Sequence, residues 1–188
     1  MNKNLSDNSK YKGLKIAITG ANGTLGKYLI KELKRKGAYV FGLTHRKKNN
    51  RNSYESNPDD WIFWSCGKEK LLSSRLADID ILILNHGFNP KEIIDSNEIN
   101  KAIEINSLSH WRLIEIFEGL AVSTNNFNKY NQKEIWVNTS EAEIQIAFSP
   151  VYEITKRLIG ELVSLKKSKL LIEKRSHCII KKLILGPF

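Results

Sequence analysis

The segment Thr19–Gly26, which reads T-G-A-N-G-T-L-G, constrains the fold of this chain more than any other feature. The apolar run Leu14–Ile18 comes directly before it and has the length and composition of a buried strand. The amphipathic stretch Lys27–Lys36 comes directly after it and has the apolar spacing of a helix. The sequence therefore predicts a strand, a glycine-rich turn and a helix in succession.

The glycines give this turn the properties of a phosphate-binding loop. Gly20 permits a tight turn, Gly23 lets the backbone approach a pyrophosphate, and Gly26 lets the helix pack closely on the strand. The helix N-terminus adds free N–H groups and the positive end of the helix dipole. We expect a dinucleotide to bind here; the alternative is a glycine-rich turn of some other α/β protein. The residues between the glycines that complete the predicted site are Asn22, Thr24 and Leu25.

Predicted strands and helices alternate along the remainder of the chain. The further strands are expected at Ala38–Thr44, Trp61–Trp64, Ile79–Leu84, Glu134–Thr139 and Cys178–Leu185. The further helices are expected at Lys68–Leu76, Asn97–Leu120 and Tyr152–Leu171. This alternation is typical of an α/β fold in which a doubly wound parallel sheet carries helices on both faces. Ligands of such sheets bind beyond the carboxyl ends of the strands.

The length and composition predict one globular domain. With 188 residues, 41% of them hydrophobic and 27% charged, the chain is expected to fold as a single domain over 13–188, after a flexible polar tail at 1–12. No apolar run approaches the roughly 20 residues that a bilayer-spanning helix needs. Cys66 and Cys178 lie far apart without metal-ligand spacing, which predicts no metal site and a reducing, cytoplasmic location.

The net charge of +10 has more than one interpretation. Basic residues cluster at 46–51, 166–169 and 181–182, and such charge is able to attract nucleic acid, to favour a phosphorylated cofactor or merely to solvate helix faces. No helix-turn-helix, zinc-finger or aromatic RNA-binding signature accompanies it. The sequence therefore disfavours a nucleic acid as partner.

Tyr152 and Lys156 are the first candidates for catalysis. They lie one helical turn apart in Y-E-I-T-K, so their side chains share a face of the predicted helix. An ammonium beside a phenol favours the phenolate, which makes Tyr152 a plausible general acid/base for a carbonyl and alcohol pair. The alternative is a tyrosine and lysine pair of the kind found on many surface helices.

Two polar residues elsewhere add to this pair. Ser140 ends a predicted strand, where its hydroxyl is able to bind a substrate oxygen, or to act as an ordinary strand-end cap. Asn106 lies inside a predicted helix, where asparagine is a mediocre helix former. Its amide is able to hold a water that relays protons to Lys156; alternatively, Asn106 is an exposed surface residue.

Taken together, these motifs resemble the short-chain dehydrogenase/reductase family. The order and approximate separations agree for the glycine-rich turn, for N-H-G at 85–87 in place of the family's N-A-G, and for the four candidate catalytic residues, although Ser140 lies about one position nearer Tyr152 than is usual in the family. The stretches L-I-L-N-H-G, V-N-T-S-E-A-E and K-L-I-L-G-P-F also resemble the reductase module of cyanobacterial sterol desaturase/short-chain dehydrogenase proteins. The resemblance covers nearly the whole chain.

This resemblance implies a Rossmann fold with a catalytic tetrad. Tyr152 would exchange a proton with the substrate oxygen while the cofactor exchanges a hydride, and Lys156 would bind the nicotinamide ribose. Ser140 would orient the substrate oxygen, with Thr139 as the second candidate for this hydroxyl, and Asn106 would complete the proton relay. Asn85 and Gly87 would support the cofactor.

The chain departs from the family pattern near its end. Glu141 and Glu143 would make the rim of the site acidic, and the family's Pro-Gly after the sixth strand is reversed as Gly186-Pro187. The later C-terminal elements of the family are missing, so the chain is either a fragment or a degenerate domain. A homo-oligomer is expected if the C-terminal part exists.

The end of the second strand bears on the choice of cofactor. Thr44, His45 and Arg46 stand there without the carboxylate that would bind the adenosine ribose and repel a 2′-phosphate. A hydroxyl followed by fixed cations favours NADP(H) over NAD(H), unless these residues are simply a solvated loop. The leading prediction is an NADP(H)-dependent oxidoreductase acting on a small-molecule carbonyl or alcohol; the alternative is a regulatory or scaffold protein that binds a dinucleotide without catalysis.

Overall fold

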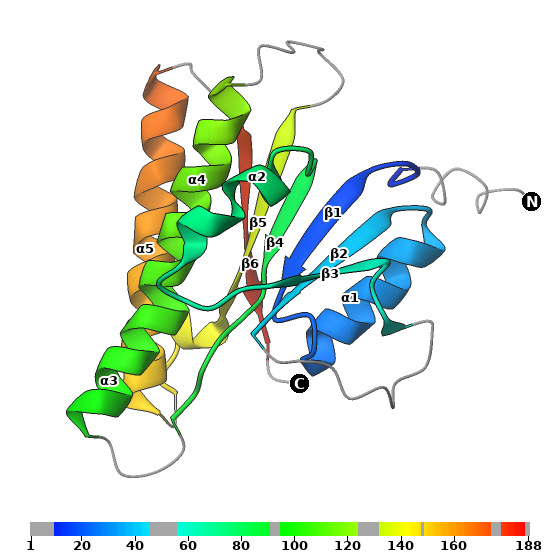
Figure 1. Cartoon of the computed structure of the whole chain (residues 1–188). Coiled ribbons are helices and arrows are strands. Elements are labelled where there is room, and N and C mark those ends of the chain that lie inside the picture. Colours follow the sequence, from blue (N-terminus) through cyan, green and yellow to red (C-terminus); the bar gives the residue numbers. More distant parts are fainter. Residues whose placement is uncertain are drawn as a thin grey trace, which may run out of the picture.

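A six-stranded parallel sheet forms the centre of the molecule (Figure 1). The computed structural model describes residues 10–45, 56–90, 95–123, 132–147, 149–173 and 178–186. The strands are β1 (Lys15–Thr19), β2 (Tyr39–Thr44), β3 (Asp60–Phe63), β4 (Ile81–Leu84), β5 (Lys133–Ser140) and β6 (Cys178–Leu185). Their order across the sheet is β3-β2-β1-β4-β5-β6. The strands β1 to β3 succeed one another toward one edge and β4 to β6 toward the other, so the topological switch point lies between β1 and β4, as in Rossmann folds. The predicted fold class is confirmed.

Helices connect the strands and cover the sheet. They are α1 (Thr24–Arg35), the short 3-10 helix η2 (Glu69–Leu72), α2 (Ser73–Leu76), α3 (Ser96–Ile103), the π-helix η3 (Glu104–Leu108), α4 (Ser109–Ser123), the 3-10 helix η4 (Glu141–Glu143) and α5 (Pro150–Glu173). Figure 1 shows α4 and α5 side by side on one face of the sheet and α1 on the other. The two faces consequently have separate cores.

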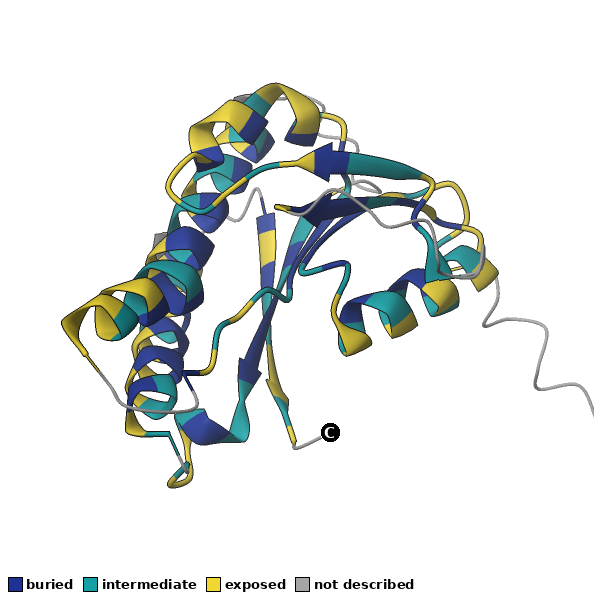
Figure 2. Ribbon diagram, turned by 60° about the horizontal axis from the view of Figure 1, so that its bottom comes forward, coloured by how far each residue is buried: buried dark blue, intermediate teal, exposed yellow. Residues whose placement is uncertain are grey.

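The two cores follow from the nearly continuous apolar character of the central strands. All four residues of β4 are buried, as expected for a strand covered on both faces. On the α1 face, Ile16 and Ile83 of the sheet belong to one cluster with Ile30 of α1. On the opposite face, Leu82 belongs to a larger cluster with residues of α2, α4 and α5, including Phe117. The pattern of burial in Figure 2 is continuous through the centre of the sheet and weakens toward β6.

The structure refines several predicted boundaries. Helix α1 begins at Thr24, three residues before the predicted start, so its first turn belongs to the glycine-rich segment. The predicted single helix over 97–120 is a continuous succession of α3, η3 and α4 that contains a π-helical segment. A π-helix holds an extra residue in its turn, which apolar spacing alone does not reveal.

The ends of the predicted domain are only partly described. Residues 10–12 of the expected tail form a turn, in which the Leu14 N–H donates to the Tyr11 carbonyl. The Tyr11 ring packs edge-on against Trp136 at 6.1 Å between centroids.

No helix in the described ranges is long and apolar enough to cross a membrane. Cytoplasmic location and oligomerisation stay predictions.

Candidate active site

A cavity of about 970 Å³ opens at the carboxyl ends of the strands, where the topology predicts a ligand. Its walls come from the glycine-rich turn, the ends of β2 and β3, the loop after β4, η3, β5, α5 and the end of β6. The predicted site residues that line it are Gly20, Asn22, Gly23, Thr24, Leu25, Thr44, His45, Asn85, Gly87, Ser140, Tyr152 and Lys156. Gly26 and Asn106 lie behind this wall, and Arg46 lies outside the described residues.

The glycine-rich turn has a backbone geometry that requires glycine at two positions. Gly20 adopts a φ of 64°, and a Cβ there would lie 2.8 Å from the Asn85 carbonyl oxygen. At Gly26 a Cβ would collide with the Gly20 carbonyl oxygen. Each of these two positions therefore requires glycine, for conformation at the first and for space at both.

The start of α1 is suited to an anion. Gly23 is its N-cap residue, no side chain caps the first turn, and that turn contains no acidic residue. Gly23, Thr24 and Leu25 line the cavity, so the free N–H groups of the first turn and the positive end of the dipole of this 12-residue helix lie at its wall. These residues fit the pyrophosphate of a dinucleotide.

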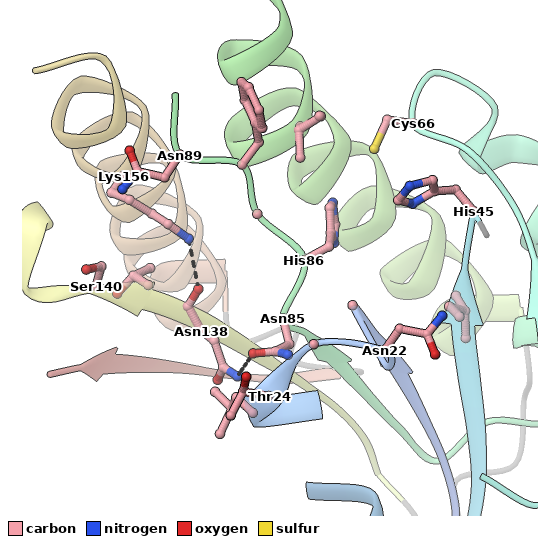
Figure 3. A pocket seen from close by; sticks show the side chains of 18 of the residues that line it. Asn22, Thr24, His45, Cys66, Asn85, His86, Asn89, Asn138, Ser140 and Lys156 are labelled. Carbon is pink, nitrogen blue, oxygen red and sulfur yellow. Dashed lines mark hydrogen bonds between the residues drawn. The ribbon is translucent and has the colours of Figure 1, made fainter. Parts of the chain in front are cut away.

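Hydrogen bonds fix the loop after β4 against its neighbours. The Asn85 N–H donates to Thr19 Oγ1 at 2.8 Å, and Asn138 Nδ2 donates to Asn85 Oδ1 at 3.1 Å (Figure 3). At Gly87, a Cβ would lie 3.4 Å from Asn106 Oδ1. The loop is thus clamped between β1, β5 and the helical segment that contains Asn106.

Asn106 is completely buried in the π-helix η3. Its Oδ1 accepts the Phe88 N–H at 2.7 Å, while Nδ2 donates to the Phe88 carbonyl at 2.7 Å and to Thr155 Oγ1 at 2.9 Å. The interpretation as an exposed surface residue is therefore wrong. Because both amide hydrogens have partners, a relayed water would have to use the second lone pair of Oδ1.

Tyr152 and Lys156 lie on the side of α5 that faces the cavity. The Lys156 Nζ lies 5.6 Å from the centre of the Tyr152 ring and donates to the Asn138 carbonyl at 3.4 Å (Figure 3). Burial of this side chain, only 4% exposed, lowers the pKa of Lys156 to about 8, against a smaller opposing effect of Glu143. An ammonium has three hydrogens, so Lys156 retains donors for a ligand.

Ser140 combines the two predicted alternatives. It is the N-cap of η4, where its Oγ accepts the Ala142 N–H at 3.3 Å, and it also lines the cavity. Its hydroxyl hydrogen is able to point into the cavity. The second candidate, Thr139, donates its hydroxyl to the Leu183 carbonyl of β6 at 3.3 Å, so Ser140 is the better placed of the two.

The end of β2 contains no acidic side chain in its described part. Thr44 is buried and its Oγ1 accepts a hydrogen bond from Asn22 Nδ2 at 2.8 Å, while His45 is exposed at the cavity wall. Among the described residues that line the cavity there is no aspartate or glutamate, whereas Lys101 and Lys156 both contribute to it. The cavity wall is thus cationic and suits a phosphorylated ligand.

Sequence reasoning missed an aromatic group at the back of the cavity. Trp64 and Cys66 line it beside His86, whose ring stacks on His110 at 4.0 Å between centroids. Burial lowers the pKa of His86 to about 3 and raises the pKa of the Cys66 thiol, so neither side chain carries a charge at neutral pH. The only signal in the sequence is the histidine of N-H-G in place of a small residue.

The fold and the cavity thus define a nucleotide-binding protein of the Rossmann type, and sequence comparison identifies its family. Residues 16–142 match the NAD dependent epimerase/dehydratase family, and the chain belongs to this family. Solved short-chain dehydrogenases share its fold, which confirms the predicted resemblance.

A named protein is similar in sequence to nearly the whole of this chain. The chain is 42% identical over 179 residues to a monoglucosyldiacylglycerol epimerase of Synechocystis sp.. The match covers 94% of the chain and 42% of the relative, so the chain spans less than half of the relative's length.

Two solved structures illustrate the fold. A short chain dehydrogenase from Burkholderia cenocepacia in complex with NADP has a TM-score of 0.77 at 19% identity, over 95% of this chain and 74% of its own. A short chain dehydrogenase from Leptospira borgpetersenii with bound NAD+ has a TM-score of 0.78 at 22% identity, over 100% and 76%. At these identities the likeness concerns the fold alone.

Proposed function

We propose that the chain binds a nicotinamide dinucleotide and interconverts an alcohol and a carbonyl on its substrate, as one half of an epimerisation. The observation that carries this proposal is the convergence of Ser140, Tyr152 and Lys156, from two separate segments, on the cavity that also contains the glycine-rich turn. A bound nicotinamide supplies the acceptor and donor of a hydride.

The three side chains have complementary tasks in this reaction. Tyr152 takes the proton of the substrate hydroxyl as the carbon that bears this hydroxyl is oxidised. Ser140 donates a hydrogen bond to the oxygen of the same hydroxyl. Lys156 binds the ribose and stabilises the phenolate of Tyr152 by its positive charge. In an epimerisation the carbonyl substrate then presents its opposite face, and Tyr152 returns the proton as the carbon is reduced.

The 42% identical relative favours a sugar as the group that reacts. Its name describes an epimerase of a glucosyl group carried on diacylglycerol. We infer that this chain acts on a hexosyl lipid or on a smaller glycoside. Because the chain spans 42% of that relative, the assignment is a proposal for the domain rather than for the relative's whole activity.

The preference for NADP(H) over NAD(H) is part of the proposal. Its support is the absence of a carboxylate among the described residues at the end of β2, where Thr44 and His45 line the cavity, and the arginine that follows in the sequence. Titration of both dinucleotides tests it, with Arg46→Ala as the variant. Tighter binding of NAD(H), or an unchanged affinity ratio in the variant, would contradict it.

The proposed chemistry is tested with the full-length chain, a hexosyl diacylglycerol and each dinucleotide. We expect epimerised product, and we expect Tyr152→Phe to lose turnover while it binds the dinucleotide with unchanged affinity. Undiminished turnover in the variant would defeat the assignment. Dinucleotide binding by a wild-type chain that turns over no hexosyl substrate would support the alternative, a binding protein without catalysis.

A further inference from the structure

His86 is the residue at which the loop after β4 departs from the family's N-A-G. Its side chain lines the cavity and extends from this loop toward the helical segment behind it (Figure 3). Its Nδ1 lies 2.8 Å from Thr19 Oγ1, and its Nε2 lies 3.2 Å from Ser109 Oγ. The imidazole therefore connects β1 to α4 through the wall of the cavity.

Counting hydrogens fixes the direction of these bonds. Thr19 Oγ1 already accepts the N–H groups of Asn85 at 2.8 Å and His86 at 3.3 Å, which occupy both of its lone pairs. The single hydrogen of Thr19 then goes to the nearer acceptor, His86 Nδ1 at 2.8 Å, in preference to the Ile83 carbonyl at 3.4 Å. The hydrogen of His86 consequently resides on Nε2.

The chain of bonds continues beyond the imidazole. Nε2–H donates to Ser109 Oγ, whose own hydrogen goes to Glu69 Oε1 at 2.7 Å. Ser109 is completely buried and Glu69 is 1% exposed. The result is a series of hydrogen bonds that all run in one direction, from Thr19 to His86, Ser109 and Glu69. This series excludes an imidazolium at His86, because Thr19 has no lone pair left to accept a second ring hydrogen.

The His110 ring packs on the face of the His86 ring. It stacks on His86 at an interplanar angle of 13°, and its Nδ1 hydrogen donates to the Ile105 carbonyl at 3.1 Å. Two neutral rings stack at this distance without the repulsion that two imidazolium ions would have. His110 contacts no atom of the Thr19–Ser109 series by a hydrogen bond in the described structure.

We propose that His86, as the neutral Nε2–H tautomer, is a positioning residue that holds the Asn85–Gly87 turn in its cofactor-binding conformation. The proposal rests on the proposed function, because it assumes that the dinucleotide binds against this turn. The same Thr19 hydroxyl receives two N–H groups of the turn, and the Asn85 carbonyl lies against Gly20 of the phosphate-binding loop. Loss of the imidazole would remove one buried hydrogen-bond partner each from Thr19 and Ser109, and would loosen the turn and the phosphate-binding loop that lies against it.

The test combines a direct view of the ring with affinity measurements on the full-length chain. In ¹⁵N-histidine NMR of the wild-type chain at neutral pH, we expect His86 to carry its hydrogen on Nε2; a hydrogen on Nδ1 would overturn the proposal. We expect His86→Ala to bind NADP(H) or NAD(H) about tenfold more weakly, the equivalent of roughly one buried hydrogen bond. Added imidazole should restore the affinity by filling the vacated space.

Matched variants separate positioning from general damage. His110→Phe keeps a ring against His86 and should leave the dinucleotide affinity unchanged, whereas Ser109→Ala should weaken it, with no further loss when combined with His86→Ala. Equal affinity of His86→Ala and wild type would overturn the proposal, as would a loss that imidazole fails to restore.

Failure of His86→Ala to fold would leave Ser109→Ala as the deciding variant, and unchanged affinity there would also overturn it. If the wild-type chain binds neither dinucleotide, the proposed function fails and the positioning role with it. If the wild-type chain binds and His86→Ala binds equally well, only the positioning role fails.

Discussion

The two ends of the cavity differ in how closely their residues are packed and in how much apolar surface they expose. At the phosphate-binding end, β1, the glycine-rich turn and the loop after β4 contact one another through backbone atoms and the buried Thr19 hydroxyl. At the opposite end, β5 leads through η4 into a segment where Ile144 is 61% and Ile146 is 93% exposed. Edge strand β6 likewise carries exposed apolar side chains, among them Leu183 and Ile184.

This difference bears separately on the binding of the cofactor and on the binding of the substrate. The phosphate-binding end depends on the backbone conformation of the glycine-rich turn and on its close approach to the loop after β4. At the opposite end Ser140 and Tyr152 line the cavity, and exposed apolar residues such as Ile144 and Ile146 lie near them in the chain. Cofactor binding is therefore built into this chain, and the fit to a substrate depends on the more open end.

The largest expected effect is at Tyr152. Tyr152→Phe removes the hydroxyl that we propose to transfer the proton, so turnover should fall by about 10²- to 10⁴-fold. The dinucleotide affinity, measured by calorimetry, should not change because the phosphate-binding end is untouched. An equal loss of affinity would show that the two ends of the cavity are not separable.

A large effect on stability is expected in the core between the sheet and α1. Ile83→Ala in β4 removes a completely buried side chain from the core beneath α1 and should lower the free energy of unfolding by about 2–5 kcal/mol. Ile146→Ala at the open end should change it by less than about 0.5 kcal/mol. Urea denaturation of both variants measures the contrast, and a comparable loss in Ile146→Ala would show that this segment is packed in solution.

A smaller effect is expected at Gly20, with Gly13 as the matched control. Both glycines have a positive φ, 64° and 79°, so an alanine at either one carries a similar backbone strain of about 1 kcal/mol. A Cβ at Gly20 also meets the Asn85 carbonyl, whereas a Cβ at Gly13 has no atom within 4 Å. Gly20→Ala should therefore weaken dinucleotide binding at least about tenfold and Gly13→Ala should not. Equal affinities would argue against a close approach in the phosphate-binding loop.

The smallest expected effect is a pH dependence of binding. Because burial lowers the pKa of Lys156 to about 8, the free protein loses this positive charge as the pH rises through that value. The dinucleotide affinity should then weaken by up to about tenfold between about pH 7 and about pH 9, since the anionic ligand binds the protonated form better. Lys156→Met should bind more weakly at neutral pH and lose this dependence; a dependence that persists in the variant would assign it to another group.

The parts predicted from the sequence are those that depend on local patterns. The glycine-rich turn and the buried strands follow from glycine placement and apolar runs, and the shared face of Tyr152 and Lys156 follows from helical spacing. Each of these features needs only neighbouring residues to be specified. The structure confirms the fold and brings these two side chains to the same cavity as the turn.

The missed features depend on contacts between distant segments. The π-helix turns Asn106 inward onto Phe88 and Thr155, although helical spacing gave no sign of the extra residue. The stack of His86 on His110 joins the loop after β4 to a helix, and the unusual histidine of N-H-G does not by itself indicate the ring on which it stacks. Such contacts are determined by tertiary packing, which overrides local propensity.

Titration of the Lys156 side chain, with and without dinucleotide, tests the central claim most directly, namely that the catalytic side chains and the dinucleotide meet in one cavity. NMR of the selectively labelled lysine should give a pKa near 8 in the free protein. With saturating dinucleotide the pKa should rise, because ribose oxygens and the negative charge of the ligand stabilise the ammonium. An unchanged Lys156 pKa in a chain that has bound the dinucleotide would contradict the account.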